Sequence, residues 1–231
     1  MRKYFNITLF LLTTSMSYSQ IHEFGAVIGG SNLIGDVGST KFVNPSDFGM
    51  GIQYRWNQST RHSWRLNYTY MPITAKDIDS DMPLRQERKL EAKNTLHEFA
   101  FGLEFNFFEF DLHNKWFAIT PYLYTGVVGF LYDDSHFDAQ KTQIFQNKNT
   151  FGMALPITMG VKTMISKQLL LSAEIGARYA FTDNLDGNNP KNTSLAVQPF
   201  GNTNNNDWYM FSAISFSYTF GKNPCYCLPS F

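Results

Sequence analysis

The sequence predicts an all-β fold, an eight-stranded antiparallel up-and-down β-barrel that crosses a membrane. Three observations predict it: an amino-terminal segment typical of export, eight aromatic-rich segments with a period of two, and connections that alternate between short and long. A closed barrel pairs each strand on both edges, so no backbone polar group is left unpaired in the lipid. Bacterial outer-membrane barrels combine these features.

Residues 1–19 are interpreted as a cleavable signal peptide. Two basic residues open the segment, and a short apolar run follows at 7–12. Ser17-Tyr18-Ser19 then gives the small-x-small pattern of a cleavage site, which places Gln20 first in the mature chain. The apolar run is too short to be a membrane anchor, since a spanning helix needs about 20 residues.

The charge balance bears on the class of partner. Without the signal peptide the chain keeps 17 of its 19 basic residues and all 19 acidic ones, a net charge of −2. A nucleic-acid surface is normally strongly basic, so we expect no nucleic-acid partner. Aromatic residues make up 16% of the chain, mostly in the alternating segments. A soluble sandwich would not need such a belt together with long loops on one side, so outer-membrane lipids are the expected surroundings.

The alternation is clearest in the last predicted strand. There Phe216, Tyr218 and Phe220 share one face, and Ser215 and Ser217 the other. The fifth strand is apolar or aromatic on both faces, so its pattern leaves its orientation open. The predicted strands are 21–30, 47–56, 62–72, 95–108, 117–130, 152–164, 168–181 and 207–220, within a barrel domain of residues 20–220.

The connections alternate in length around this barrel. In bacterial barrels short turns face the periplasm and long loops face outside. An even strand number then puts both ends of the barrel, and the carboxyl-terminal tail 221–231, on the periplasmic side. The predicted turns are Asn57–Arg61, Glu109–Trp116 and Ile165–Lys167, and the predicted loops are 31–46, 73–94, 131–151 and 182–206.

Eight strands leave a lumen only wide enough for side chains to fill. The inward positions carry four acidic and four basic residues, which are expected to pair because a lone buried charge is costly. We therefore predict a closed polar plug rather than a diffusion pore. Its members are Glu23, Arg55, Arg65, Glu98, Glu104, Lys162, Glu174 and Arg178.

Candidate chemistry lies in the predicted loops. His136 is near Asp133 and Asp134, and the alternatives are a catalytic or metal role and a solvated loop, of which the solvated loop is favoured. The stretch 183–188 has oxygen ligands and a glycine but no closing acid at the twelfth position, so turn chemistry explains it better than calcium. The charged stretch 84–93 is either a short amphipathic helix over the barrel mouth or a solvated loop.

Three longer stretches carry a resemblance to a known family. They are EFGAVIGGSNLIGDVG at 23–38, LHEFAFGLEFNFFEFDLH at 96–113 and ITPYLYTGVVGF at 119–130. Together with the export junction SYSQ, they resemble the PorG family. These are small outer-membrane β-barrels of the type IX secretion system of Bacteroidetes bacteria. Ile-Gly-Asp at 34–36 and Phe-Asp-Leu-His at 110–113 are the least generic motifs.

The resemblance implies a non-enzymatic accessory of the secretion machine. Family members associate with a periplasmic ring, formed by a lipoprotein and its partner subunit, and link it to the outer membrane. In gliding relatives the same machine exports surface adhesins. The family offers no catalytic residues to carry over, and no cofactor is expected. The competing classes are a stand-alone barrel for adhesion or envelope stability and, less favoured, a lipid-modifying barrel enzyme.

The tail after Phe220 is a candidate interaction segment, and a disordered terminus is the alternative. On the periplasmic side, apolar residues there would face a ring. Cys-x-Cys is a strained spacing for a local disulfide, and two thiolates alone make an incomplete metal site. The candidate contact residues are Cys225, Tyr226, Cys227, Leu228 and Phe231.

Overall fold

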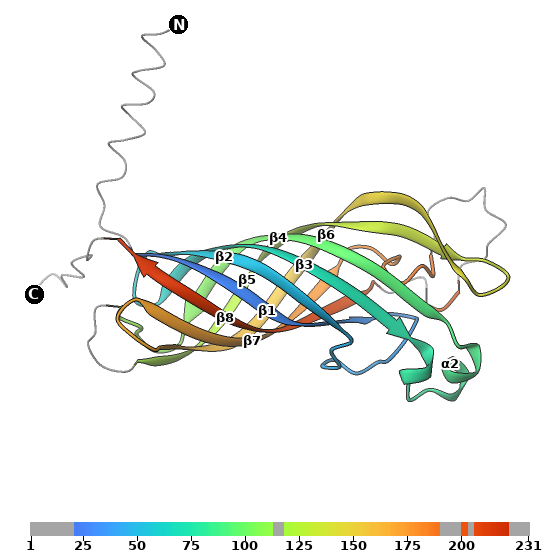
Figure 1. The fold of residues 1–231 in the computed structure, drawn as a ribbon, viewed down its shortest axis with the longest axis horizontal. Coiled ribbons are helices and arrows are strands. Elements are labelled where there is room, and N and C mark those ends of the chain that lie inside the picture. Colours follow the sequence, from blue (N-terminus) through green and yellow to red (C-terminus); the bar gives the residue numbers. More distant parts are fainter. Residues whose placement is uncertain (1–20, 113–117, 190–199, 203–205, 222–231) are drawn as a thin grey trace, which may run out of the picture.

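The computed structural model describes residues 21–112, 118–189, 200–202 and 206–221. Its eight strands form one closed antiparallel barrel in chain order, with β1 pairing both β2 and β8 (Figure 1). The predicted fold class is therefore confirmed. The strands are β1 (Ile21–Ile34), β2 (Asp47–Asn57), β3 (His62–Lys76), β4 (Glu91–Asn106), β5 (Ile119–Phe137), β6 (Gln143–Met164), β7 (Leu169–Ala180) and β8 (Trp208–Phe220).

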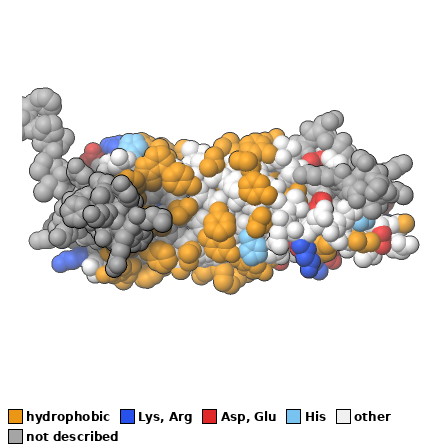
Figure 2. All heavy atoms as spheres, turned by 90° about the horizontal axis from the view of Figure 1, so that it is seen from above, with side chains coloured by type: hydrophobic (Ala, Val, Ile, Leu, Met, Phe, Trp, Pro, Cys, Tyr) orange, Lys and Arg blue, Asp and Glu red, His pale blue; other side chains and the backbone are white. Residues whose placement is uncertain are grey.

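The outer wall of the barrel is apolar. On β4 the alternate side chains Phe99 and Phe101 are 57% and 49% exposed, while their neighbours Glu98 and Ala100 are buried inside. Figure 2 shows hydrophobic side chains over the middle of the wall and charged ones toward its ends. An outward apolar band of this kind faces the lipid in transmembrane barrels. The architecture is that of a small outer-membrane β-barrel.

The two ends of the barrel differ. At one end, the terminus end, His22 pairs with Phe220, and short turns such as 58–61 and 165–168 join the strands. At the other, the loop end, the β3–β4 and β5–β6 hairpins extend past the other strands on opposite sides (Figure 1). The β3–β4 hairpin carries a 3-10 helix, η2 (Asp77–Asp79), and a helix, α2 (Pro83–Arg88).

The predicted loop 131–151 is wrong in extent, because β5 and β6 continue through most of it and leave only 138–142 as a turn. The ladder pairs Phe137 with Gln143 and shifts register near Asp134. Polar residues dominate this stretch, so its sequence resembles that of a solvated loop. The inner face is nevertheless buried, because loop residue Asn184 bonds to Asp134 and to the carbonyl of Ser135.

Of the two alternatives for 84–93, the helix is present as α2, although it spans only 83–88 and buries no residue. Two arginines tie this helix to the β1–β2 connection. Arg85 donates to the carbonyls of Gly35 and Gly38 at 3.0 and 2.8 Å, and Arg88 donates to that of Asp36 at 2.7 Å. Among the described residues, no helix has the length and apolarity needed to cross a membrane.

The lumen changes character along the barrel axis. Toward the terminus end it holds the charged side chains predicted for the plug, all buried. Toward the loop end it becomes an apolar core in which Met71, Ile73, Leu96, Phe130 and Leu185 pack together. The barrel interior is therefore filled by two different chemistries.

The orientation of β5, which the sequence left open, is resolved by the structure. Val127 is 57% exposed on the outer wall, whereas Tyr122, Tyr124, Phe130 and Tyr132 are each 1% exposed inside. The inner face of this strand is thus aromatic. The predicted signal peptide 1–19 and tail 222–231 lie outside the described residues.

Candidate functional site

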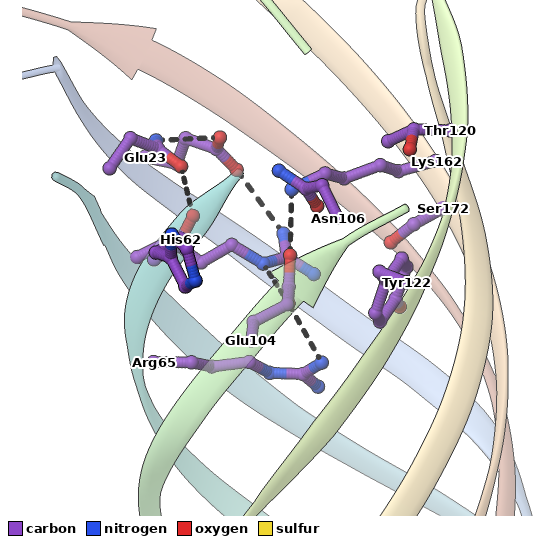
Figure 3. A network of polar contacts seen from close by, with 12 residues as sticks. Glu23, His62, Arg65, Glu104, Asn106, Thr120, Tyr122, Lys162 and Ser172 are labelled. Atoms are coloured by element: carbon purple, nitrogen blue, oxygen red, sulfur yellow. Dashed lines mark hydrogen bonds and ion pairs between the residues drawn. The ribbon is translucent and has the colours of Figure 1, made fainter. Parts of the chain in front are cut away.

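Glu104 of β4 lies at the centre of the network of charged side chains in the lumen (Figure 3). Its Oε2 accepts from Arg55 Nε at 2.8 Å and from Arg65 Nη1 at 3.4 Å, and its Oε1 accepts from Lys162 Nζ at 2.7 Å. Arg55 also reaches Glu23 Oε2 at 3.2 Å. Four strands, β1 to β4, and β6 across the lumen are therefore joined by two carboxylates and three cations.

Arg65 extends the plug toward β7. It binds Glu174 through two parallel hydrogen bonds of 2.7 Å, a bidentate geometry that fixes both side chains. Tyr122 of β5 donates to the same carboxylate at 2.6 Å. The guanidinium of Arg65 also lies 4.7 Å from the ring centroid of Tyr124, within range of a cation–π contact.

Glu98 and Arg178 form a separate pair nearer the loop end. Arg178 Nε lies 3.3 Å from Glu98 Oε2, and Tyr209 donates to the same oxygen at 2.8 Å. Arg178 also donates to the carbonyl of Gly176 at 2.9 Å. The structure thus divides the eight predicted residues into a connected group of six and a pair. From here on, the charged plug means Glu23, Arg55, Arg65, Glu104, Lys162 and Glu174.

The aromatic members of these networks could not be found from the sequence pattern. Tyr122 and Tyr124 lie on β5, where both faces are apolar or aromatic, and Tyr209 lies within the short apolar run 208–211. Their hydroxyls or ring faces meet the charges at close range. The arrangement fills the lumen with paired groups, which leaves little room for an aqueous path.

A second polar cluster lies among the loops at the other end and is acidic. Asp186 is fully buried, and its Oδ2 accepts from the backbone N–H groups of Asp36 and Val37 at 2.7 and 2.9 Å. Asp207 accepts from Leu185 N at 2.9 Å. The acid cluster comprises Asp36, Asp183, Asp186 and Asp207.

Gly35 shows how close two of these carboxylates lie. A Cβ at this position would be 2.6 Å from both Asp186 Oδ2 and Asp207 Oδ1, so the two carboxylates face one point of the backbone and only glycine fits there. Burial raises the pKa of Asp186 to about 6, with the charge of Asp36 adding to the effect. Burial and then the charge of Asp186 raise the pKa of Asp207 well above its usual range.

Asp77 of η2 is the contrasting carboxylate at this end. Arg88 Nε lies 2.7 Å away, and Gly38 N and Leu90 N also donate to it. Burial opposes ionisation of Asp77, but these hydrogen bonds outweigh it and lower its pKa. The ionised carboxylates of the acid cluster are stabilised less by cations, since the closest basic contact among the described residues is Arg85, 4.0 Å from Asp36.

The side chains of His136 and of the 183–188 segment make structural hydrogen bonds. The expectation of a solvated loop around His136 is wrong: the side chain is 6% exposed in β5, and its Nδ1 lies 3.1 Å from Gln146 Nε2. In 183–188 the side-chain oxygens cap backbone N–H groups, as in Asn188 N to Asp186 Oδ1 at 3.1 Å. Within the described ranges, no group of three or more His, Cys, Asp or Glu is arranged to hold a metal ion.

A closed eight-stranded barrel with an apolar outer band and a filled lumen defines a small outer-membrane β-barrel protein. The chain belongs to the family described as "Domain of unknown function (DUF6089)", whose model matches residues 2–229. No curated protein matches the sequence. The resemblance to the PorG family therefore stays a proposal about function.

Solved structures similar to this chain are small barrels of low sequence identity. The amino-terminal β-barrel domain of OprF from Pseudomonas aeruginosa has 10% identity and a TM-score of 0.45, and the match covers 88% of this chain and 100% of that one. OprG from Pseudomonas aeruginosa has 11% identity and a TM-score of 0.45, with coverages of 89% and 97%. Neisserial surface protein A has 13% identity and a TM-score of 0.40, with coverages of 86% and 94%.

Proposed function

We propose that this protein is a non-enzymatic outer-membrane accessory of the type IX secretion system, linking the periplasmic ring lipoprotein and its partner subunit to the outer membrane. The observation that carries the proposal is the filled lumen, in which Glu104 joins Arg55, Arg65 and Lys162. A barrel cross-linked inside acts through its surfaces rather than as a channel. The proposed partner is inferred from the resemblance to the accessory family, which lies in 23–38, 96–113 and 119–130.

The terminus end is the proposed docking face for the ring. In this proposal both ends of the chain are periplasmic, so the short turns 58–61 and 165–168 and the tail 222–231 face the ring. Aromatic and apolar anchors dominate many interfaces, and Tyr226, Leu228 and Phe231 supply them here. Cys225 and Cys227 flank Tyr226 in the sequence, and a reduced and a bonded pair are both compatible with the proposal.

Co-purification from native membranes tests the proposal. The full-length protein is expected to retain both ring subunits, and a chain lacking 222–231 is expected to fold, reach the outer membrane and lose them, with secretion reduced. Leu84→Asp is the matched control, because this side chain is 80% exposed at the opposite end of the barrel. A truncated protein that still captures the ring would exclude the tail as the contact.

The second candidate is a stand-alone barrel for adhesion or envelope stability that acts through the loop end. It is favoured by large apolar side chains exposed on two connections there: Phe42 at 61%, Ile78 at 60% and Leu84 at 80%. The same co-purification separates the two candidates. If the intact protein brings no ring subunits while Leu84→Asp weakens cell attachment, the stand-alone function replaces the secretion role.

A further inference from the structure

A polar crevice of about 580 Å³ opens on the outer wall at the loop end, between the start of β2, the end of β3 and the start of β4. Volumes of this size are typical of small-molecule sites. Its walls carry two lysines, Lys76 and Lys93, and three carboxylates, Asp47, Asp79 and Glu91. The charged plug and the proposed ring contact lie elsewhere, toward the terminus end.

The crevice lies just beyond the apolar band. Along β4 the outward side chains change from Phe99 to His97 and then to Lys93 and Glu91. His97 pairs with Tyr70 on β3, with ring centroids 5.3 Å apart, and this pair marks the edge of the band. Lys93 is four residues further on, about 13 Å along a strand and less along a tilted barrel axis. This is the depth at which lipid head groups meet the protein.

The charged side chains are distributed unevenly over the lining of the crevice. Lys76 Nζ and Lys93 Nζ both approach one oxygen of Glu91, at 3.4 and 3.0 Å, so this wall has an excess positive charge. On another part of the lining, Asp47 accepts only from the hydroxyl of Ser46, at 3.1 Å, among the contacts described for its side chain. The site therefore offers ammonium donors for an anion together with carboxylates that accept from hydroxyl groups.

We propose that this crevice binds the phosphorylated sugar head group of a glycolipid in the leaflet next to the loop end. The phosphate lies against Lys76 and Lys93, and sugar hydroxyls donate to Asp47 and Asp79. A simple anionic phospholipid uses only the lysines, and the carboxylates repel a second negative charge. The mixed lining thus favours a ligand with one phosphate near many hydroxyls.

Native mass spectrometry of the folded full chain in detergent tests the proposal. The probes are monophosphorylated lipid A, the same lipid without its phosphate, and phosphatidylglycerol. Removing two charge-assisted contacts in Lys76→Gln/Lys93→Gln is expected to weaken lipid A binding at least about tenfold. The matched control is Lys141→Gln/Lys148→Gln, two exposed lysines outside the crevice at the same end, and it is expected to bind normally. Asp79→Ala is expected to weaken lipid A without affecting phosphatidylglycerol.

Three outcomes would overturn the proposal. The first is unchanged lipid A binding in the crevice variant, and the second is an equal loss in the control variant. The third is equal retention of lipid A with and without its phosphate. Thr74→Trp keeps every charge but fills the crevice from its β3 wall, and it is expected to lose lipid A as well. Binding that survives this substitution would place the lipid elsewhere on the wall.

Discussion

The charged plug and the acid cluster bury ionisable groups in opposite ways. In the plug, Glu104 is 0% exposed but touches three cations. In the acid cluster, Asp186 is equally buried, yet it is held by backbone N–H groups and faces Asp207 across Gly35. Both carboxylates accept hydrogen bonds, but only the charge of Glu104 is compensated by cations.

This difference determines how each end of the barrel responds to a change in pH. A buried ion pair costs desolvation, and removal of one partner strands the other charge, so the plug is rigid once formed. The acid cluster can instead relieve its repulsion by taking up a proton. We therefore expect the lumen to be insensitive to ordinary pH changes and the loop end to respond to them.

The largest effect is expected from Glu104→Ala, which removes the carboxylate that Arg55, Arg65 and Lys162 share and leaves Lys162 without a carboxylate partner among the described contacts. The loss in the free energy of unfolding is expected to be about 3–5 kcal/mol. Urea titration in lipid vesicles measures it. Glu109→Ala is the matched control, because Glu109 and its partner Arg61 are 70% and 45% exposed. An exposed pair contributes roughly 0–1 kcal/mol, and equal losses in the two variants would contradict the role of the plug.

Along β4, the outer surface passes from the apolar band to the loop end, and this gives a second comparison. Phe101→Arg puts a cation into the band and is expected to lower the free energy of unfolding by about 2–4 kcal/mol. Thr95→Arg, on the same face but past His97, is expected to change it by less than about 1 kcal/mol. The same urea titration is used. Similar costs at both positions would mean that the band extends beyond His97.

The smallest effect concerns pH. Asp183, Asp186 and Asp207 have raised pKa values, so the folded loop end keeps protons that an opened one releases, and its stability falls as pH rises through about 6. Hydrogen exchange of 35–38 and 183–189, corrected for intrinsic rates, is expected to show roughly tenfold more opening at pH 8 than at pH 5.

The matched variant for the pH experiment is Asp186→Asn/Asp207→Asn, which keeps acceptors for the backbone N–H groups but loses the charges. Its opening is expected to be independent of pH across the same range. Asp77 does not add to the change, because its lowered pKa keeps it ionised throughout. A wild-type loop end that opens equally at pH 5 and pH 8 would contradict the contrast between the two regions.

Much of this fold follows from the sequence, because strands with one face in lipid and one inside must alternate. That constraint placed all eight strands, and each of the eight lumen charges that it predicted is buried. It failed in the β5–β6 extension, where the polar residues Asp134, Ser135 and His136 are buried by another loop rather than solvated. Burial of this kind depends on contacts between segments about 50 residues apart, such as Asn184 with Asp134.

The candidate sites were predicted less completely for the same reason. Tyr122 joins the charged plug and Tyr209 joins the Glu98–Arg178 pair through hydroxyl groups, which a hydrophobic pattern does not reveal. The acid cluster combines Asp36 with Asp183, Asp186 and Asp207, which are distant in the sequence, and the sequence showed only polar loop chemistry there. The position of the crevice beside Lys76 and Lys93 depends on where the apolar band ends. That boundary could not be predicted from the sequence, because it requires the strand register.

Planar-bilayer recording from the purified barrel tests the central claim, that paired charges fill the lumen and leave the protein to act through its surfaces. The wild-type protein is expected to give no conductance steps above background, because Glu104, Arg65 and Glu174 cross-link the lumen between facing strands. Large, reproducible steps from the wild-type monomer would contradict the account.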